Sequence, residues 1–221
     1  KVGDSLSADD SYLSIMNRDG HQLGPYDFLA DTIAYYGPSL ADDSVAAQIG
    51  LSSIAVFDPF WAPAPPCEPN ETPLQCEYRI RQPSVAMVLY GPNDVRSMTT
   101  EIYHQQMLRI VDESLALGVI PVLMTFSVDP DDELWWQSLE FNLALADIAE
   151  ARGVPLINLW AAARFLPAYG LDEDKVHLLQ SGFAALNYTT GHEAFYGVSL
   201  QNLLAIRTLD EIRRLLVADA Q

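Results

Sequence analysis

Basic residues and long apolar runs are scarce in this sequence, and each shortage excludes a class of protein. Only 12 lysines and arginines stand against 30 aspartates and glutamates among the 221 residues, which gives a net charge of -18. Such a charge repels both the phosphate backbone of nucleic acids and anionic membrane surfaces, so neither is an expected partner. No apolar run reaches the roughly 18 residues that a transmembrane helix needs, so we predict no membrane span.

The sequence also lacks the motifs of several large enzyme groups. It contains no G-x-S-x-G nucleophile elbow, Walker loop, H-E-x-x-H zinc helix or Rossmann glycine pattern. These absences argue against an α/β-hydrolase, a nucleotide-binding protein or a zinc protease. The acidic cluster at residues 129–133 could hold calcium, but no twelve-residue calcium loop surrounds it, and a solvated acidic surface is the simpler explanation.

Cysteine is rare as well, since the chain has only Cys67 and Cys76, within the stretch CEPNETPLQC. No cysteine or histidine lies at zinc-finger spacing from them, so no metal site is expected. A local disulfide fits this Pro-rich stretch better, and the alternative is a pair of free thiols in a cytosolic protein. A disulfide would place the protein in an oxidising compartment, so we expect it to be secreted or otherwise extracytoplasmic.

The apolar pattern predicts strands alternating with helices. Continuous apolar runs, typical of strands buried on both faces, lie at residues 84–90, 119–126 and 154–159, and helical spacing marks residues 101–117, 131–151 and 200–216. This alternation predicts an α/β fold: a single three-layer α/β/α domain over residues 1–221, with a parallel sheet, flavodoxin-like in outline. Residues 59–81, rich in Pro and polar side chains, are expected to form an ordered insertion loop pinned by the disulfide.

Three short motifs fall at strand ends or in loops of this scheme. They are GDSL at residues 3–6, GPND at 91–94 and DKVH at 174–177. Each is weak alone, but their order and placement resemble the first, third and fifth blocks of the GDSL/SGNH hydrolase superfamily. The resemblance extends over most of the chain. One departure is that only Lys1 and Val2 precede the first block, where the family has a full strand.

The resemblance implies a serine esterase. Ser5 would be the nucleophile and His177 its base, because a serine hydroxyl needs a partner to take its proton and imidazole, with an ordinary pKa of about 6.5, suits that task. Asp174 would orient His177 from the ring nitrogen that faces away from Ser5. The oxyanion would be met by the Ser5 N–H, the side-chain amide of Asn93 and the N–H of a second-block glycine, for which Gly50 matches better than Gly37.

Such a reaction needs neither a metal nor an organic cofactor, and its substrate would be a lipid, short-chain acyl or acetylated carbohydrate ester. Trp61, Trp135 and Trp136 could line the substrate site or lie in a core or lid. Asp4 and Asp94 are expected to hold the backbone of their loops. The other three histidines, His21, His104 and His192, are expected to be surface residues.

Other interpretations of the same residues stay open at this point. Ser5 could cap a helix, Asn93 could be an ordinary turn residue, and His177 could be a loop histidine with no role in chemistry. Asp172 is a rival for Asp174, although it does not fit the D-x-x-H spacing. The alternative function is a binding or assembly module that keeps the fold without turnover, and covalent labelling by a fluorophosphonate would distinguish the two.

Overall fold

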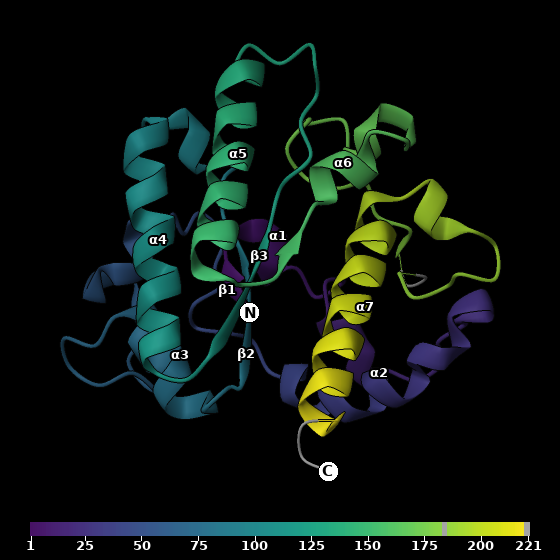
Figure 1. The fold of residues 1–221 in the computed structure, drawn as a ribbon, viewed down its shortest axis with the longest axis horizontal. Coiled ribbons are helices and arrows are strands. Elements are labelled where there is room, and N and C mark those ends of the chain that lie inside the picture. The colour runs from purple at the N-terminus through teal and green to yellow at the C-terminus, as the bar shows by residue number, and fades with distance from the viewer. Residues whose placement is uncertain (183–184, 219–221) are drawn as a thin grey trace. The chain divides into compact units, whose positions relative to one another are not determined.

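The computed structural model describes residues 1–182 and 185–218 and shows two compact units (Figure 1). The first, which we call the sheet unit, comprises Lys1–Ala8 and Asp43–Trp160. The second, which we call the helical unit, comprises Asp9–Asp42 and Ala161–Gln221. The chain therefore leaves the sheet unit after its first eight residues and returns to it at Asp43.

A four-stranded parallel sheet forms the centre of the sheet unit. Its strands, in spatial and sequence order, are β1 (Val2–Gly3), β2 (Val85–Leu89), β3 (Ile120–Met124) and β4 (Leu156–Ile157). An isolated parallel bridge joins Gly3 to Ala47. The segment at Ala47 thus stands beside β1 where a further strand would lie. If this segment is counted as the second strand along the chain, the strand order across the sheet is the flavodoxin-like 2-1-3-4-5, with the second strand reduced to one residue pair.

Helices α4 (Thr100–Ala116) and α5 (Trp135–Arg152) lie side by side and pack against β3 (Figure 1). Each buries a run of apolar side chains against the sheet, as the helical spacing predicts. The aromatic rings of Tyr103 and Phe141 stack between the two helices with centroids 4.1 Å apart. Gly153, in the left-handed conformation, ends α5 as predicted.

The helical unit is built around two α-helices and several single turns. Helix α2 (Ala30–Tyr36) packs against α7 (Gly197–Ala218), and the Thr32 hydroxyl donates a hydrogen bond of 2.6 Å to the buried Asp210 carboxylate. The remaining α-helices of the chain are α1 (Ser5–Ala8), α3 (Pro73–Arg81) and α6 (Leu159–Ala163). Short 3₁₀ segments lie, within the described residues, at Ser14–Asn17, Gly24–Leu29, Gly37–Leu40, Ala55–Phe57, Pro59–Trp61, Asp94–Arg96, Pro167–Gly170 and His192–Ala194. Among the described residues, no helix is long and apolar enough to cross a bilayer.

Two predicted boundaries are wrong. Helix α5 begins at Trp135 rather than at residue 131, because the side chains of Asp129 and Asp132 bond backbone N–H groups two residues ahead and hold residues 129–134 in turns. Residues 59–81 are not a loop throughout, since α3 occupies Pro73–Arg81. A capping box in which Thr72 and Gln75 exchange side-chain-to-backbone bonds starts that helix.

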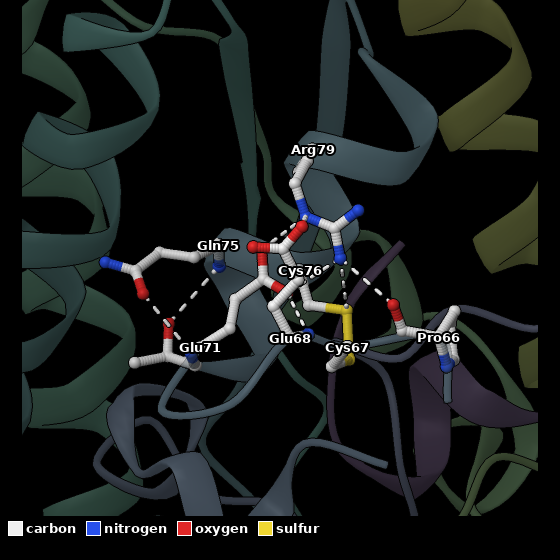
Figure 2. Close-up of polar contacts among 8 residues, drawn as sticks. Pro66, Cys67, Glu68, Glu71, Gln75, Cys76 and Arg79 are labelled. Atoms are coloured by element: carbon white, nitrogen blue, oxygen red, sulfur yellow. Dashed lines mark hydrogen bonds and ion pairs between the residues drawn. A yellow bond between two sulfur atoms is a disulfide. The ribbon is translucent and has the colours of Figure 1, made fainter. Parts of the chain in front are cut away.

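The expected disulfide is present between Cys67 and Cys76, with the second cysteine on α3 (Figure 2). The Arg79 guanidinium lies over the closed loop and bonds both carboxylate oxygens of Glu71, at 2.7 and 2.8 Å, and the carbonyl of Pro66 at 3.0 Å (Figure 2). The two sulfur atoms and the Glu71 carboxylate form a cluster of metal-ligand type. The sulfurs are bonded to each other, so neither is a thiolate that could bind a metal.

Candidate active site

Three of the expected site residues follow neighbouring segments of the sheet unit. Ser5 comes two residues after β1, and Asn93 comes four residues after β2, whose last residue Leu89 pairs with Gly3. Gly50 comes three residues after Ala47, the bridge partner of Gly3. Because the pairing is parallel, these residues leave from the carboxyl edge of the sheet, at its topological switch point, where open α/β sheets bind ligands.

The turn that carries Ser5 is closely packed. Gly3 is buried, and a Cβ atom there would lie 2.2 Å from the Ser7 hydroxyl and 2.3 Å from the Leu89 carbonyl oxygen, so only glycine fits. The buried carboxylate of Asp4 accepts the Leu6 N–H at 3.0 Å. Asp4 thus caps α1 with its side chain, as expected for a residue that holds its loop, and the capping role open to Ser5 is taken by its neighbour.

The turn that carries Asn93 depends on a glycine of the same kind. Gly91 has a φ of 142°, and a Cβ atom there would lie 2.1 Å from the Phe126 ring. Asn93 is partly exposed and precedes the 3₁₀ turn Asp94–Arg96, but its side chain makes no capping hydrogen bond within this part of the described chain. The Asn93 amide is therefore not used to hold its own turn.

The segment that carries Gly50 is fixed by Gln48. The Gln48 N–H donates to the Gly3 carbonyl at 3.2 Å, and its side-chain amide donates to the carbonyls of Val45 and Trp61 at 2.6 and 3.0 Å. Gly50 itself is exposed with a φ of 80°, a conformation that suits glycine. The Trp61 ring lies 3.9 Å from the position of a Cβ atom at Gly50.

The two candidates for the second-block glycine lie in different units. Gly37 begins a 3₁₀ turn of the helical unit, where a Cβ atom would lie 2.9 Å from the Met16 carbonyl oxygen. That close approach gives Gly37 a packing reason to be glycine. Gly50 shares the sheet unit with Ser5 and Asn93 and stays the better match.

A fully buried carboxylate, Asp94, joins two of these segments. Its oxygens accept the Ser53 N–H at 3.2 and 3.3 Å, across 41 residues of sequence. Burial raises the pKa of Asp94 to about 6, although hydrogen bonds from the Ser53 N–H and hydroxyl oppose the rise. Asp94 was expected to hold the backbone of its own loop, but nothing in the sequence pointed to Ser53 as its partner.

In the helical unit, Asp174 and His177 form a close pair. The Asp174 Oδ2 and His177 Nδ1 atoms are 2.5 Å apart, and Asp174 Oδ1 accepts the N–H groups of Val176 and His177 at 2.9 Å each. Lys175 has a φ of 58°, the left-handed conformation that tightens this turn. Partial desolvation disfavours the Asp174 carboxylate, but the His177 ring and the two N–H donors outweigh it and lower its pKa to about 2.

The rival carboxylate, Asp172, is used differently. Its Oδ1 atom accepts the Glu173 N–H at 2.8 Å, and its own N–H donates to the His177 carbonyl at 2.8 Å. Asp172 therefore closes the loop through its backbone, while Asp174 holds the imidazole ring. The structure thus places Ser5, Gly50 and Asn93 in the sheet unit, and it pairs Asp174 with His177 in the helical unit.

The tryptophans and the other histidines are placed separately. Trp61 lies beside Gly50, whereas Trp135 and Trp136 begin α5, with Trp136 76% exposed. His21 contacts the Met16 carbonyl through Nε2 at 3.2 Å, and His192 packs edge-on against Tyr196. These histidine contacts are local ones within the helical unit.

Comparison with solved structures decides the fold. A lipase/acylhydrolase from Enterococcus faecalis matches with a TM-score of 0.55 and 17% identity, covering 94% of this chain and 92% of that one. An acetylxylan esterase from Geobacillus stearothermophilus matches with a TM-score of 0.59 and 14% identity, covering 94% and 91%. This chain has the fold of the GDSL hydrolases.

A lipolytic protein of the G-D-S-L family from Desulfitobacterium hafniense has the same fold, with a TM-score of 0.56 and 14% identity over 93% of this chain and 95% of that one. The predicted α/β class with a parallel sheet flanked by helices is therefore confirmed. No protein-family model matches the sequence. No curated protein matches it either. At these identities the likeness extends to the fold alone.

Proposed function

We propose that this chain is a serine esterase that hydrolyses carboxylic esters through an acyl-enzyme on Ser5. In this proposal His177 is the general base and acid, and Asp174 orients it. The Ser5 N–H, the Gly50 N–H and the Asn93 side-chain amide form the oxyanion hole. The fold, shared with esterases and lipases, supports this assignment.

The Asp174–His177 pair is the observation that carries the proposal. A carboxylate 2.5 Å from Nδ1 of the imidazole keeps a proton on that nitrogen, which leaves Nε2 unprotonated and able to accept one. Asp174 stays ionised throughout the neutral range because its pKa is about 2. A loop histidine with no role in chemistry has no need of a carboxylate held in place by two backbone N–H groups.

The proposed reaction has two halves, each with a balanced proton transfer. The Ser5 hydroxyl attacks the ester carbonyl while its proton passes to His177 Nε2, and a tetrahedral oxyanion forms. The intermediate collapses, the alcohol leaves with the proton from His177, and Ser5 carries the acyl group. Water, deprotonated by His177, then attacks the acyl-enzyme and releases the carboxylic acid. No step requires a metal or an organic cofactor.

The proteins with similar solved structures are a lipolytic protein, a lipase/acylhydrolase and an acetylxylan esterase. We propose an ester from one of these classes as the substrate. The Cys67–Cys76 disulfide supports an extracytoplasmic location for the reaction.

The deciding experiment is labelling with a fluorophosphonate, followed by peptide mapping and a panel of p-nitrophenyl acyl esters and acetylated xylo-oligosaccharides. We expect the label on Ser5 and its loss in both Ser5→Ala and His177→Ala. Ser7→Ala is the matched control, because this buried serine lies one half-turn along the same helix and should leave labelling unchanged. A wild-type protein that neither reacts nor hydrolyses any ester would be a binding module with this fold.

A further inference from the structure

We propose that Asp94 is a positioning residue for the oxyanion hole, which ties the segment bearing Gly50 to the turn bearing Asn93. The proposal rests on the function given above and concerns one side chain that does not touch the substrate. The sheet unit alone contains every residue it involves.

The connection is direct at both ends. Asp94 is the next residue after Asn93, so anything that fixes the Asp94 side chain also fixes the backbone from which the Asn93 amide extends. Ser53 lies three residues after Gly50, and its N–H donates to both Asp94 carboxylate oxygens, at 3.2 and 3.3 Å. Asp94 and Ser53 are both fully buried, so water does not compete for this bond.

Each segment also has its own backbone bonds. The Gly50 segment is joined to β1 through the bond from the Gln48 N–H to the Gly3 carbonyl. The Asn93 turn is joined to β2 through the chain itself and is closed by the Val95 N–H, which donates to the Gly91 carbonyl at 2.9 Å. The Asp94–Ser53 bond links these two turns directly. Two longer contacts lie beside it: the Ser53 hydroxyl meets the Met98 sulfur at 3.8 Å, and the Tyr90 hydroxyl donates to the Ala46 carbonyl at 3.4 Å.

An oxyanion hole needs this spacing to be fixed before the reaction begins. Its donors stabilise the developing charge only if they are already aimed at the oxygen, and misplacement by about 1 Å can cost about 100-fold in rate. Burial makes an ionised Asp94 costly at neutral pH, and the hydrogen bonds from Ser53 partly offset that cost. A charged acceptor binds an N–H more strongly than a neutral one does.

The primary test is Asp94→Ala in the full chain, assayed on p-nitrophenyl acetate at a temperature where circular dichroism shows the variant folded. We expect kcat to fall about 10- to 100-fold, less than for the loss of a whole oxyanion donor, with KM within about 3-fold of the wild type. Asp94→Asn keeps an oxygen that can accept the Ser53 N–H and should recover kcat to within about 5-fold. If Asp94→Ala does not fold, Asp94→Ser supplies the same test, because its hydroxyl is too short to reach Ser53.

A control separates positioning from loss of stability. Asp210 is also a buried carboxylate, in α7, where it accepts the Thr32 hydroxyl and pairs with Arg214. Asp210→Ala should lower the melting temperature and leave kcat unchanged. If Asp94→Ala likewise lowers the melting temperature but keeps kcat within about 2-fold, the positioning role is wrong.

A double-variant cycle supplies a second readout. If Asp94 acts through the oxyanion donors, Asp94→Ala should cost less in an Asn93→Ala background than in the wild type, since one donor is already gone. Two effects that simply multiply would overturn the proposal. Failure of the proposed function is recognised separately, because Ser5→Ala would then keep the wild-type activity whatever Asp94 does.

Discussion

Asp94 and Asp174 differ in their surroundings although they are used in the same way. Asp94 accepts the backbone N–H of Ser53 and adjoins Asn93, and Asp174 accepts two backbone N–H groups and orients His177 in the proposed site. Asp94 is fully buried with Ser53 as its bonding partner, and its pKa rises to about 6. The Asp174 side chain is 51% exposed and accepts two backbone N–H groups and an imidazole, and its pKa falls to about 2.

This contrast shows that the number and charge of donors, weighed against burial, determines which form of a carboxyl group is favoured. Asp174 is fixed as an anion by its own short turn. Asp94 is buried, with a raised pKa, by a fold that brings together residues 41 positions apart. The proposed base half of the site is therefore local in origin, and the proposed oxyanion half depends on tertiary structure.

The largest loss of activity among the following predictions is expected in the base half of the proposed site. Asp174→Asn should lower kcat about 10³- to 10⁴-fold, because the amide cannot hold the proton on His177 Nδ1 or stabilise the imidazolium. Steady-state kinetics on p-nitrophenyl esters measures the loss. Asp172→Asn is the matched control, and we expect it to stay within about 3-fold of the wild type. Equal losses in the two variants would contradict the assignment of Asp174.

In the oxyanion half, Asn93→Ala should lower kcat about 100- to 1,000-fold with little change in KM. The reason is that the Asn93 amide meets a negative charge that exists only as the tetrahedral intermediate forms. His177→Ala, measured alongside, should be at least as slow. A change that falls mainly on KM would make Asn93 a substrate-binding residue and remove it from the oxyanion hole.

The origin of each half explains what the sequence could predict. The D-x-x-H spacing places a carboxylate and an imidazole in one turn, so the Asp174–His177 pair was predicted from four residues. Apolar runs predicted the buried strands β2 and β3, and helical spacing predicted the helix α4.

Other features could not be predicted, because their structure comes from contacts distant in sequence. Strand β1 has two residues and exists only through its neighbours in the sheet. Strand β4 was predicted from the apolar run at residues 154–159, but its restriction to Leu156–Ile157, which pair with β3, was not. The bond from Ser53 to Asp94 has no local signature at all. Helix α3 is a different case, since its capping box at Thr72 was present in the sequence and the Pro-rich composition around it favoured a loop.

A third prediction concerns the contribution of the disulfide, which belongs to neither half of the proposed site, to the stability of the fold. Replacing Cys67 and Cys76 together by serine removes a closure of nine residues in sequence. We expect a loss of about 2–3 kcal/mol in the free energy of unfolding, from the greater entropy of the unfolded chain. Urea unfolding monitored by circular dichroism measures it, and kcat at 20 °C should not change. A drop in kcat of more than about 5-fold would show that the disulfide loop supports the site.

The smallest effect tests the contrast between the two carboxylates directly, through the pH dependence of stability in Asp94→Asn. The pKa of Asp94 is raised from 3.8 to about 6 on folding, so between these values the folded chain binds more protons than the unfolded one. The contribution of Asp94 to the free energy of unfolding therefore falls as the pH rises between these two pKa values. An asparagine at this position does not titrate, so its variant does not lose stability in this way.

Relative to the wild type, Asp94→Asn should gain about 1–2 kcal/mol in the free energy of unfolding between pH 5 and pH 8. The ionisable groups that interact with Asp94 are the buried Tyr90 and Tyr103, and Asp4 acts on the same two tyrosines. The nearby Arg96 pairs with Asp132. For Asp174→Asn, the pH dependence of the stability difference from the wild type should have the opposite sign. It should appear only below about pH 4, because folding lowers the pKa of Asp174 and so stabilises its ionised form. Urea unfolding at pH 5, 6, 7 and 8 measures the first difference, and parallel curves for wild type and Asp94→Asn would mean that Asp94 does not titrate in this range.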